Sequence, residues 1–571
     1  MPEAASGAPR NIAAHLADMA RLQPARPAVI CAHGRDAQGA VAYAQLSFSE
    51  LEAESNRLAR GLEGIGIRRG VRAALMVPPS LAFFTLTFAL FKTGAVPVLI
   101  DPGIGLDHLR GCLAQAEPEA FIGISKAHAA RVLLGWAKRS VRIKLTAGAR
   151  WFWGGHTLAG LLARAPAAEA GGERGGPAFA AIEPGPGETA AILFTSGSTG
   201  APKGAVYTHE MFGAQVEQIR ALYAIAPGET DLATFPLFAL FGPALGMTAV
   251  VPEMDASRPA RVDPANIVGA IEKFGISNMF GSPALINRVA RYGEERKIKL
   301  ASLRRVISAG APVPARVLAR FAAMLSPGAQ IFTPYGATEC LPVASIGSDE
   351  ILGETRQRTD AGAGVCVGRP VPGLVARVIR ISDDAIETWS DALALPAGEI
   401  GEIAVKAAHA ARSYFNLPEA TALAKIQDPE HGGFYHRMGD VGYFDTGGRL
   451  WFCGRKAHRV VTRGQTRFTI PCEAVFNAHP EVFRTALVGV RLNGEMRAVL
   501  CVELEAAAKG EPIETLCEEL RLLGAAHAHT RDIDTFLFHP AFPVDVRHNA
   551  KIFREKLAAW AAAKLAAGKP R

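Results

Sequence analysis

The sequence has few of the features that mark secreted, zinc-binding or disulfide-linked proteins. Its eight cysteines are scattered, without a CxxC pair or a cluster of His and Cys. We therefore expect reduced thiols, a cytoplasmic location and no structural zinc. Residues 1–10 contain no apolar run of the kind found in a signal peptide.

Long hydrophobic runs and a strong charge bias are missing as well. The apolar segment 81–91 ends at Lys92, well short of the ~20 residues that a membrane span needs. Residues 235–252 carry no charge but are interrupted by prolines and glycines, so we expect no transmembrane segment. With 62 basic and 54 acidic residues the net charge is only +8, so no nucleic-acid partner is expected.

The composition is that of a folded protein with more than one domain. Hydrophobic residues make up 49% and charged residues 20% of the chain, which excludes intrinsic disorder. A chain of 571 residues exceeds the size at which a single hydrophobic core stops growing. Two or more domains are therefore expected.

The segment Phe194–Gly204 (FTSGSTGAPKG) is the strongest functional pattern in the chain. Gly197, Gly200 and Gly204 permit positive φ angles and a close approach of the backbone to an anion. Lys203 adds a positive charge. Four side chains add hydroxyl donors: Thr195, Ser196, Ser198 and Thr199. Together these properties predict a loop that binds polyphosphate.

The residues on either side predict a strand before this loop and a helix after it. Residues 190–194 form an apolar run, and Thr208 is a candidate N-cap followed by apolar residues at helical spacing. The loop is not a Walker A loop, because Pro202 precedes Lys203 and Gly204 follows it where Ser or Thr would be required. The alternative interpretation is a Ser/Gly-rich turn without a ligand.

Strands and helices alternate over the first two thirds of the chain, which predicts an α/β fold. Residues 48–62 are expected to form a helix and residues 71–77 a buried strand. Residues 303–312 and 330–339 are each expected to form a strand that ends in a loop. Because ligands bind at the carboxyl ends of strands in such sheets, these two loops and the glycine loop should lie together.

The last third of the chain changes character. Residues 367–452 are rich in hairpin signals, including Gly447-Gly448. We place a domain boundary at residues 454–455, which gives an N-terminal domain of residues 1–453 and a C-terminal domain of residues 454–571 that ends in an alanine-rich helix. A basic segment without acidic residues begins at this boundary: Arg455, Lys456, Arg459, Arg463 and Arg467.

Five separated segments resemble, in the expected order, the motifs of the adenylate-forming enzymes, which include acyl-CoA synthetases, peptide-synthetase adenylation domains and luciferases. The resemblance covers roughly residues 45–557, and its segments are 194–204, 308–312, 335–339, 437–442 with 454–455, and 547–552. It implies an α/β fold with a large N-terminal adenylate-forming domain, made of stacked α/β subdomains and a small β-barrel-like region. A small, mobile α+β C-terminal domain would follow.

The resemblance also implies how ATP would be bound. The glycine loop would hold the phosphates, and Tyr335 would stack on the adenine. The backbone of small residues would approach the base at Gly310, Ala311, Pro312 and Gly336. Asp440 would accept the ribose hydroxyls, although Met438 replaces the Thr usually found in that motif, and Arg455 would make a second ribose contact.

Four residues are the candidates for catalysis: Lys203, Thr338, Glu339 and Lys551. By resemblance, Thr338 would hydrogen-bond the α-phosphate and Glu339 would hold Mg²⁺ as a hard oxygen ligand. Lys551 would reach the substrate carboxylate and the α-phosphate, where negative charge shifts in the transition state. The alternative for Glu339 and Lys551 is an ordinary solvated surface charge.

The uncharged apolar segment 235–252 is a candidate wall of an acyl pocket. The alternative is a segment that only packs in the hydrophobic core. The candidate lining residues of the pocket are Phe235, Phe238, Ala239, Phe241 and Met247. Ala239 occupies the position at which many fatty acyl ligases have His. The hinge between the two expected domains has the sequence Gly454-Arg-Lys-Ala457, where Gly-Arg-x-Asp is usual. Both departures argue against the ordinary transfer of the acyl group to CoA.

Taken as a whole, the amino-acid sequence most resembles the β-lactone synthetases of bacterial long-chain olefin biosynthesis. That resemblance implies a 2-alkyl-3-hydroxy fatty acid as substrate, whose own 3-hydroxyl would displace AMP and close a β-lactone. Partners would be a condensing enzyme, a ketoreductase and a β-lactone decarboxylase. By position alone, four histidines are candidates for a general base: His209, His436, His458 and His548.

Two other functions stay open on the sequence. A long-chain acyl-CoA or acyl-carrier-protein ligase would use the basic hinge segment to receive phosphates, although that segment could equally be a solvated strand facing ATP. A nucleotide-binding sensor without turnover is the non-enzymatic alternative, and it requires Lys551 to be dispensable.

Overall fold

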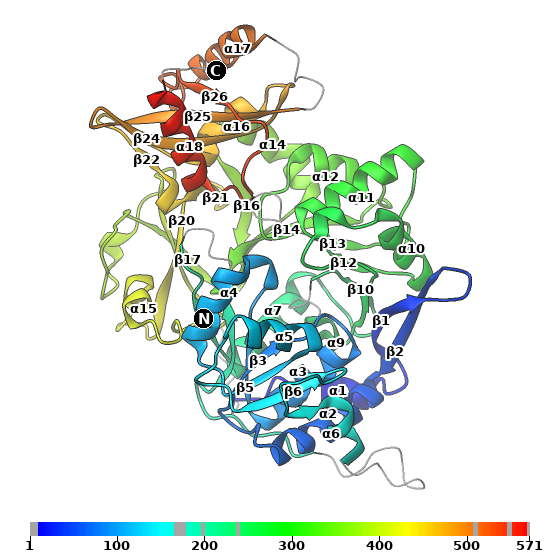
Figure 1. The fold of residues 1–571 in the computed structure, drawn as a ribbon. Helices are drawn as coiled ribbons and strands as arrows, with labels where there is room; N and C mark the ends of the chain where they lie inside the picture. The colour runs from blue at the N-terminus through cyan, green and yellow to red at the C-terminus, as the bar shows by residue number, and fades with distance from the viewer. Residues whose placement is uncertain are drawn as a thin grey trace.

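The structure is a computed structural model that describes residues 9–164, 179–195, 200–235, 240–505, 512–544 and 551–567. Figure 1 shows a large body, coloured blue to yellow, with a smaller orange and red part above it. No helix within these ranges has the length and hydropathy of a membrane span. All eight cysteines are free thiols.

A seven-stranded sheet forms one layer of the large body, in the order β7-β6-β5-β3-β4-β8-β9. Its pairs are parallel except β8–β9. The strands are β3 (Arg72–Met76), β4 (Val96–Leu99), β5 (Ala120–Ile124), β6 (Ile143–Ala147), β7 (His156–Thr157), β8 (Thr189–Phe194) and β9 (Gly204–Thr208). In β3, Ala73 and Leu75 belong to one core cluster and Ala74 to another, because successive side chains point to opposite faces.

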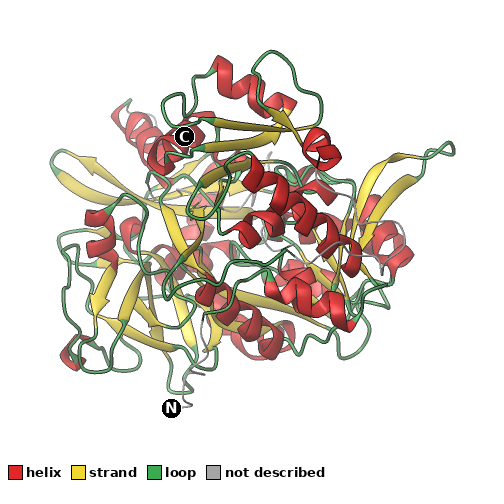
Figure 2. Ribbon diagram, turned by 90° about the horizontal axis from the view of Figure 1, so that it is seen from below, coloured by secondary structure: helices red, strands yellow, loops and turns green. Residues whose placement is uncertain are grey.

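Helices cover both faces of this sheet. Figure 2, seen from below, shows helices packed against strands throughout the molecule. One face packs against α1 (Ala14–Leu22), α2 (Phe48–Gly64), α3 (Leu81–Thr93), α6 (Leu158–Arg164) and α7 (His209–Leu222). The other face packs against α4 (Leu106–Ala116) and α5 (Ser125–Leu133). The sheet is therefore buried on both sides, as parallel sheets generally are.

A second, larger sheet continues through the rest of the large body, in the order β17-β18-β20-β21-β16-β15-β14-β13-β12-β10-β11-β1-β2. Its parallel part is built from β1 (Pro27–Arg35), β10 (Thr230–Ala233), β11 (Thr248–Val251), β12 (Asn278–Phe280), β13 (Arg305–Ile307) and β14 (Gln330–Ala337), with β2 (Val41–Ser47) antiparallel at the edge. The helices beside it are α9 (Phe241–Leu245), α10 (Pro264–Phe274), α11 (Pro283–Arg296) and α12 (Ala315–Ala322).

The β-rich region expected to be barrel-like consists of antiparallel strands that extend this second sheet. The strands are β15 (Cys340–Gly347), β16 (Val365–Pro370), β17 (Val375–Ile379), β18 (Gly401–Lys406), β19 (Lys425–Gln427), β20 (Phe434–Phe444) and β21 (Leu450–Arg455). The short helices of this region are α13 (Ser348–Glu350), α14 (Arg356–Asp360) and α15 (Pro418–Ala424). The β20–β21 hairpin confirms the turn predicted at Gly447-Gly448.

The smaller part follows β21 and has a sheet of its own, with the order β24-β25-β26. Core clusters lie on both faces of that sheet. Its elements are β22 (Val460–Val461), β23 (Thr466–Arg467), α16 (Thr469–Asn477), β24 (Val482–Leu492), β25 (Glu495–Leu504), α17 (Ile513–Ala525), β26 (Phe536–Phe538) and α18 (Arg554–Ala566). The alanine-rich terminal helix predicted from the sequence is α18.

Most of the elements expected from the sequence are present, with one difference around the glycine loop. Thr208 caps α7 by accepting a hydrogen bond from the backbone N–H of Met211, as predicted. The loop does not lead directly into that helix, however, because β9 intervenes and pairs with β8. The sequence Gly204-Ala-Val-Tyr-Thr208 is rich in β-favouring residues, and its pairing with β8 closes the loop into a hairpin.

A second difference concerns the segment after β13. Residues 330–339 were expected to form a strand that ends in a loop, and β14 occupies most of this segment, continues to Ala337 and forms a hairpin with β15. Gly336 permits this close pairing, because a Cβ at that position would lie 2.5 Å from the carbonyl oxygen of Cys340. Only Thr338 and Glu339 remain in the connecting turn.

Candidate active site

One cavity of about 620 Å³ collects residues from both sheets and from the smaller C-terminal part. Its polar lining includes Thr195, Lys203, Thr338, Glu339, Arg455 and Lys551. Its apolar lining includes Phe212, Phe235, Leu240, Phe241, Phe280 and Leu341. A volume of this size suits a drug-sized ligand or a large part of a lipid. The cavity therefore has a charged end, which suits an anionic nucleotide, and an apolar wall.

The structure brings most of the described candidate residues together in this cavity. Eleven of them line it: Thr195, Gly200, Lys203, Phe235, Phe241, Gly310, Gly336, Thr338, Glu339, Arg455 and Lys551. The lining does not include Ala311, Pro312, Tyr335, Asp440 or Met247. The remaining candidates lie outside the described residues: Ser196, Gly197, Ser198, Thr199, Phe238 and Ala239.

The two ends of the glycine loop are held together by paired hydrogen bonds. The backbone N–H of Thr195 donates to the carbonyl of Lys203 over 3.0 Å. The backbone N–H of Lys203 donates to Oγ1 of Thr195, also over 3.0 Å. This pinning places the Lys203 side chain in the cavity wall next to the loop.

The glycines of the loop serve two different purposes. Gly200 has a φ of 149°, a conformation that favours glycine. Gly204 was grouped with the glycines that permit a positive φ, but it does not have one. It is required instead by packing, because a Cβ there would lie 2.8 Å from Cγ2 of Ile192 on the paired strand β8.

Glu339 is held in place by a tyrosine that the sequence analysis did not single out. The hydroxyl of Tyr414 donates to Oε1 of Glu339 over 2.6 Å. The ammonium group of Lys203 lies 5.0 Å from the centroid of the Tyr414 ring, within range of a cation–π contact. Tyr414 therefore connects the phosphate-loop lysine to the candidate metal ligand.

A buried lysine lies behind this group. The Nζ of Lys425 donates to the carbonyl of Ala411 and contacts Nδ1 of His436 over 3.0 Å. Burial lowers the pKa of Lys425 to about 8, although the charge of Glu339 opposes this shift. Burial and the Lys425 charge hold the pKa of His436 well below its usual value, so this histidine is neutral.

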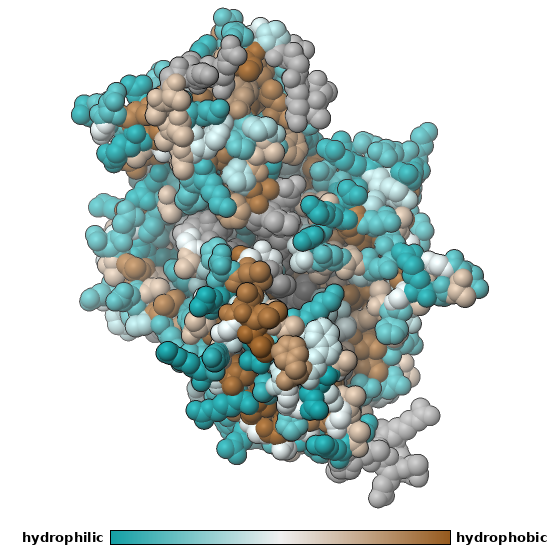
Figure 3. Space-filling model, viewed as in Figure 1, coloured by the Kyte–Doolittle hydropathy of each residue, from teal (hydrophilic) through white to brown (hydrophobic). Residues whose placement is uncertain are grey.

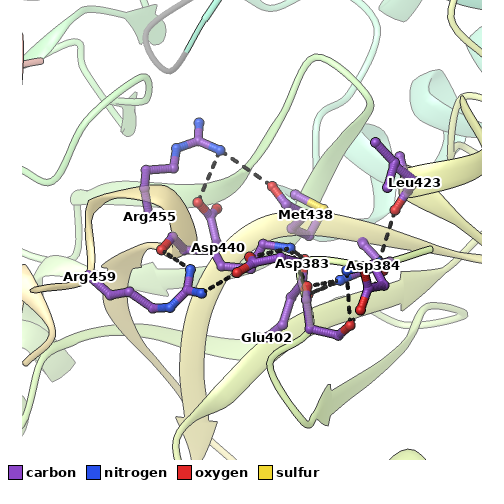
Figure 4. Close-up of polar contacts among 12 residues, drawn as sticks. Asp383, Asp384, Glu402, Leu423, Met438, Asp440, Arg455 and Arg459 are labelled. Atoms are coloured by element: carbon purple, nitrogen blue, oxygen red, sulfur yellow. Dashed lines mark hydrogen bonds and ion pairs between the residues drawn. The ribbon is translucent and has the colours of Figure 1, made fainter. Parts of the chain in front are cut away.

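Asp440 is buried and engaged by two partners. The hydroxyl of Tyr335 donates to its Oδ2 over 2.7 Å. Nη1 of Arg455 lies 3.1 Å from its Oδ1 (Figure 4). Burial raises the pKa of Asp440, while the charge of Arg455 and the Tyr335 hydrogen bond oppose that rise. Tyr335 and Asp440 thus lie just behind the cavity wall, with Arg455 between them and the ligand space.

The basic hinge segment is neutralised by acidic partners. Nζ of Lys456 lies 3.3 Å from Glu402, and Nη2 of Arg459 lies 2.6 Å from Asp383 (Figure 4). Farther along, Arg463 pairs with Glu495 over 3.0 Å and Arg467 with Asp532 over 3.5 Å. With the Arg455–Asp440 pair, every cation of this segment has a carboxylate partner.

The apolar wall is assembled from elements far apart in the sequence. The rings of Phe235 and Phe280 are 5.9 Å apart, and those of Phe212 and Phe241 are 6.3 Å apart. Only Phe235 and Phe241 were predicted, because they belong to one continuous apolar segment. Phe212 was recognised as a core position of α7, and Phe280 at the end of β12 carried no signal. Met247 lies instead beside a smaller adjoining cavity of about 50 Å³.

The candidate histidines do not contribute to the described cavity lining. His209 accepts a hydrogen bond from the backbone N–H of Ile12, and His458 lies 3.4 Å from Glu555. Burial lowers the pKa of both to about 4. His548 lies outside the described residues. A structural role accounts for the three histidines that are described.

The chain is similar to known proteins over nearly its whole length. The family model of AMP-binding enzymes matches residues 16–415. An olefin beta-lactone synthetase of Xanthomonas campestris pv. campestris is 51% identical over 556 residues, covering 97% of this chain and 97% of the relative. An olefin beta-lactone synthetase of Stenotrophomonas maltophilia is 51% identical over 563 residues, covering 98% and 99%. Among solved structures, an amide bond synthetase from Marinactinospora thermotolerans has a TM-score of 0.76 at 23% identity, covering 96% of this chain and 99% of that one, a likeness of fold.

Proposed function

The chain belongs to the family of AMP-binding enzymes, and from that membership we propose that it converts a 2-alkyl-3-hydroxy long-chain fatty acid to a β-lactone at the expense of ATP. The observation that carries the proposal is the 51% identity to two olefin beta-lactone synthetases over at least 97% of the chain. The cavity that joins a charged end to a phenylalanine-rich wall supports it independently.

The first step is the activation of the acid as an acyl-adenylate. A carboxylate oxygen of the substrate attacks the α-phosphorus of ATP, and pyrophosphate leaves. Lys203 and Lys551 both line the cavity and supply positive charge toward the phosphates and the carboxylate. Most of the acceleration then comes from positioning and electrostatic stabilisation, as in other phosphoryl-type transfers.

The donor set of the cavity suits magnesium ions. Mg²⁺ binds through one or two carboxylates together with substrate phosphates, and Glu339 presents a carboxylate beside Lys203 and Thr338. The Tyr414 hydrogen bond would orient that carboxylate. Mg²⁺ bound there would neutralise phosphate charge, and Glu339 would hold it.

Asp440, Tyr335 and Arg455 are proposed to form the nucleoside end of the site. The carboxylate of Asp440 is oriented by Tyr335 and Arg455 and is buried, which makes it a strong acceptor for ribose hydroxyls. We also propose that the glycine loop binds the phosphates through Thr195, Ser196, Gly197, Ser198, Thr199 and Gly200.

The second step closes the ring without a second substrate. The 3-hydroxyl oxygen attacks the activated carbonyl carbon, the bond to AMP breaks, and AMP leaves. The nucleophile is already tethered, which is worth several kcal/mol compared with a bimolecular reaction. The carboxylate partners of the hinge cations support this route over transfer to CoA, because those cations are already neutralised.

Several finer points belong to the same proposal. The boundary between the two domains is proposed at residues 454–455, at the end of β21, after which the chain leads toward the separate sheet of the smaller part. A cytoplasmic location is proposed, together with functional links to a condensing enzyme, a ketoreductase and a β-lactone decarboxylase. These links rest on the names of the two relatives.

The decisive experiment incubates the purified protein with ATP, Mg²⁺ and a defined 2-alkyl-3-hydroxy acid, with and without CoA. We expect AMP release and a β-lactone, identified by mass spectrometry, in both reactions. The same acid without its 3-hydroxyl should support pyrophosphate exchange but give no lactone. Strict dependence of AMP release on CoA, with an acyl-CoA product, would overturn the proposal in favour of an acyl-CoA ligase.

A further inference from the structure

An apolar face lies on the outside of the N-terminal part, and none of its exposed side chains lines the cavity described above. Six large hydrophobic side chains that are exposed to solvent form it: Leu106, Val132, Leu133, Leu134, Trp151 and Phe152. They are half of the twelve large hydrophobics that are exposed in the described chain. Figure 3 shows hydrophobic surface gathered over α4 and α5 on this side of the molecule. Clustering of this kind marks an interaction site.

The aromatic part of the apolar face is fixed by a buried anchor. The ring of Trp153 stacks on His128 of α5 with centroids 5.3 Å apart, and its Nε1 donates to Oγ1 of Thr146 over 3.0 Å. The rings of Trp151 and Phe152 lie within 5.3 Å of that anchor ring. Trp153 is buried while its two neighbours are 53% and 71% exposed, so the exposed rings are held in place.

The apolar face is continuous with the helices that flank the cavity. α4 and α5 share one core cluster on the same face of the first sheet. Leu106 of the apolar face begins α4, and Gln115 near the other end of that helix lines the cavity. The helix has eleven residues, which corresponds to a length of roughly 16 Å. The face therefore lies within one short helix of the ligand space.

The surroundings of the apolar face on α5 and at residues 151–152 are basic, while Asp107 beside Leu106 adds one exposed carboxylate. Residues 120–168 contain eight Lys and Arg residues and no Asp or Glu, although the chain has 54 acidic residues. Within the described part of the chain, none of the eight forms an ion pair with a carboxylate. Six of the eight are exposed: Lys126, Lys138, Arg139, Arg142, Arg150 and Arg164.

We propose that this face docks the protein on an anionic lipid bilayer. Exposed Trp, Phe and Leu side chains surrounded by Lys and Arg are the combination that binds the interface of such a membrane, the apolar groups entering the headgroup region and the cations pairing with lipid phosphates. Docking places the end of α4, and with it the cavity, next to the bilayer. The inference goes beyond the proposed function, although a long-chain substrate held in the membrane would give it a purpose.

Vesicle co-sedimentation of the full-length protein tests the docking. We expect binding to vesicles of phosphatidylcholine with phosphatidylglycerol, weak binding to phosphatidylcholine alone, and loss of binding as salt rises, because screening weakens the charge term. The tryptophan emission should shift to the blue on binding as Trp151 leaves water. An absence of binding to the anionic vesicles overturns the proposal.

A matched pair of leucine variants tests the location of the surface. Leu133 is 80% exposed on the apolar face, and Leu522 is 74% exposed on α17 in the smaller part. Leu133→Glu should lower the vesicle partition coefficient about tenfold, whereas Leu522→Glu should leave it unchanged. Equal effects of the two variants overturn the proposal. The proposal is also overturned if the wild-type protein is a dimer and Leu133→Glu makes it monomeric, because a second copy would then cover the face.

A pair of charge reversals tests the electrostatic part. The double variant Lys138→Glu/Arg142→Glu should lower partitioning on anionic vesicles at least about 25-fold. The control Arg261→Glu/Arg291→Glu, beside the second sheet, should leave partitioning unchanged. If the protein binds an acidic protein but does not bind vesicles, the face recognises a protein partner. That result would overturn membrane docking. Lactone formation from detergent-dispersed substrate should be normal in all four variants, which separates a failure of docking from a failure of the proposed function.

Discussion

At the scale of single residues, the cavity sets three cations against two carboxylates. Lys203, Arg455 and Lys551 line it together with Asp101 and Glu339. Lys203 and Lys551 suit a ligand with several phosphate charges, whereas the charge of Arg455 is balanced by Asp440. The three cations come from separate regions of the chain and meet only in the folded protein.

Replacement of Lys551 tests its proposed role in adenylation. We expect Lys551→Ala to lower the rate of ATP–pyrophosphate exchange about 10²–10³-fold, because one preorganised positive group is lost from the transition state. ATP binding, measured by calorimetry, should change little. Lys556→Ala, an exposed lysine on the following helix, is the control and should exchange normally. Undiminished exchange in Lys551→Ala would favour a sensor that does not turn over.

Replacement of Glu339 tests the proposed magnesium site. Glu339→Gln keeps an oxygen for the Tyr414 hydroxyl but removes the charge, so the side chain should stay in place while Mg²⁺ binding weakens. The Mg²⁺ concentration at half-maximal pyrophosphate release should rise about tenfold or more. Asp349→Asn, which removes an exposed carboxylate, serves as the control. Identical Mg²⁺ titrations for Glu339→Gln and wild type would refute the role.

A buried carboxyl beside the smaller cavity gives a prediction on pH. Burial raises the pKa of Asp231 to about 7, against the opposing effects of the Asn278 hydrogen bond and the Arg305 charge, while Glu229 adds to the rise. Because the folded state holds this proton up to a higher pH than the unfolded state, Asp231 destabilises the fold increasingly as pH rises from about 4 to 7. Asp231→Asn should remove that loss.

The measurement compares melting temperatures at pH 5 and pH 8. Relative to wild type, Asp231→Asn should be more stable at pH 8, by up to about 4 kcal/mol for a shift of this size, and the gain should shrink at pH 5. Asp349→Asn, on the surface, should show no pH-dependent difference. A gain for Asp231→Asn that is the same at both pH values would contradict the assigned ionisation.

At the scale of elements, the hinge is fixed by a buried ionic cluster between two strands of the large body. Glu402 on β18 accepts hydrogen bonds from Arg437 on β20 over 2.7 Å and from Lys456 directly after β21 over 3.3 Å. Arg437 also donates to the carbonyl of Asp384 over 2.7 Å. The strand pair thereby holds the start of the hinge against the large body.

Loss of the Glu402 charge should loosen this cluster. Glu402→Gln leaves the buried Arg437 without its carboxylate partner and leaves Lys456 with only Asp383, 4.0 Å away. We expect this loss to cost about 3 kcal/mol and to lower the melting temperature by several degrees. Glu399→Gln removes an exposed carboxylate three residues away and is the control. Equal melting temperatures for the two variants would show that the cluster contributes no net stability.

At the scale of the whole molecule, ligand binding should couple the large body to the smaller part. The cavity lining includes Lys551 of the smaller part and Lys203 of the large body, so an acyl-adenylate would contact both. A non-hydrolysable acyl-adenylate analogue at 100 times its Kd should stabilise the protein by about 2.7 kcal/mol. With the two ligands at the same concentration, thermal unfolding should show a larger shift with the analogue than with AMP. Equal shifts with both ligands would contradict a cavity shared by nucleotide and acyl chain.

Much of the fold could be predicted because its signals are local. The run 190–194, the Thr208 cap and the Gly447-Gly448 turn each depend on neighbours within a few residues, and the corresponding β8, α7 and the β20–β21 hairpin are present. Strand β9 was missed because its five residues gain their stability from pairing with β8, which local propensity does not report.

The site residues that belong to short sequence motifs could be predicted. The sequence alone identified Lys203, Thr338, Glu339, Arg455 and Lys551, and the structure places all five in one cavity. Their roles stay predictions until the variants above are measured. Lys203 was identified from the residue types of the glycine loop, and the other four because their segments resemble the motifs of the adenylate-forming enzymes.

Only the tertiary structure decided which other residues complete the site and how the charges are distributed. Tyr414 reaches Glu339 across 75 residues, and Phe280 joins the apolar wall from another strand. The hinge cations are basic in the sequence but neutralised in space by Asp440, Glu402 and Asp383. The physical reason is that packing and charge pairing depend on distance in space, which a sequence of residues does not contain until the chain has folded.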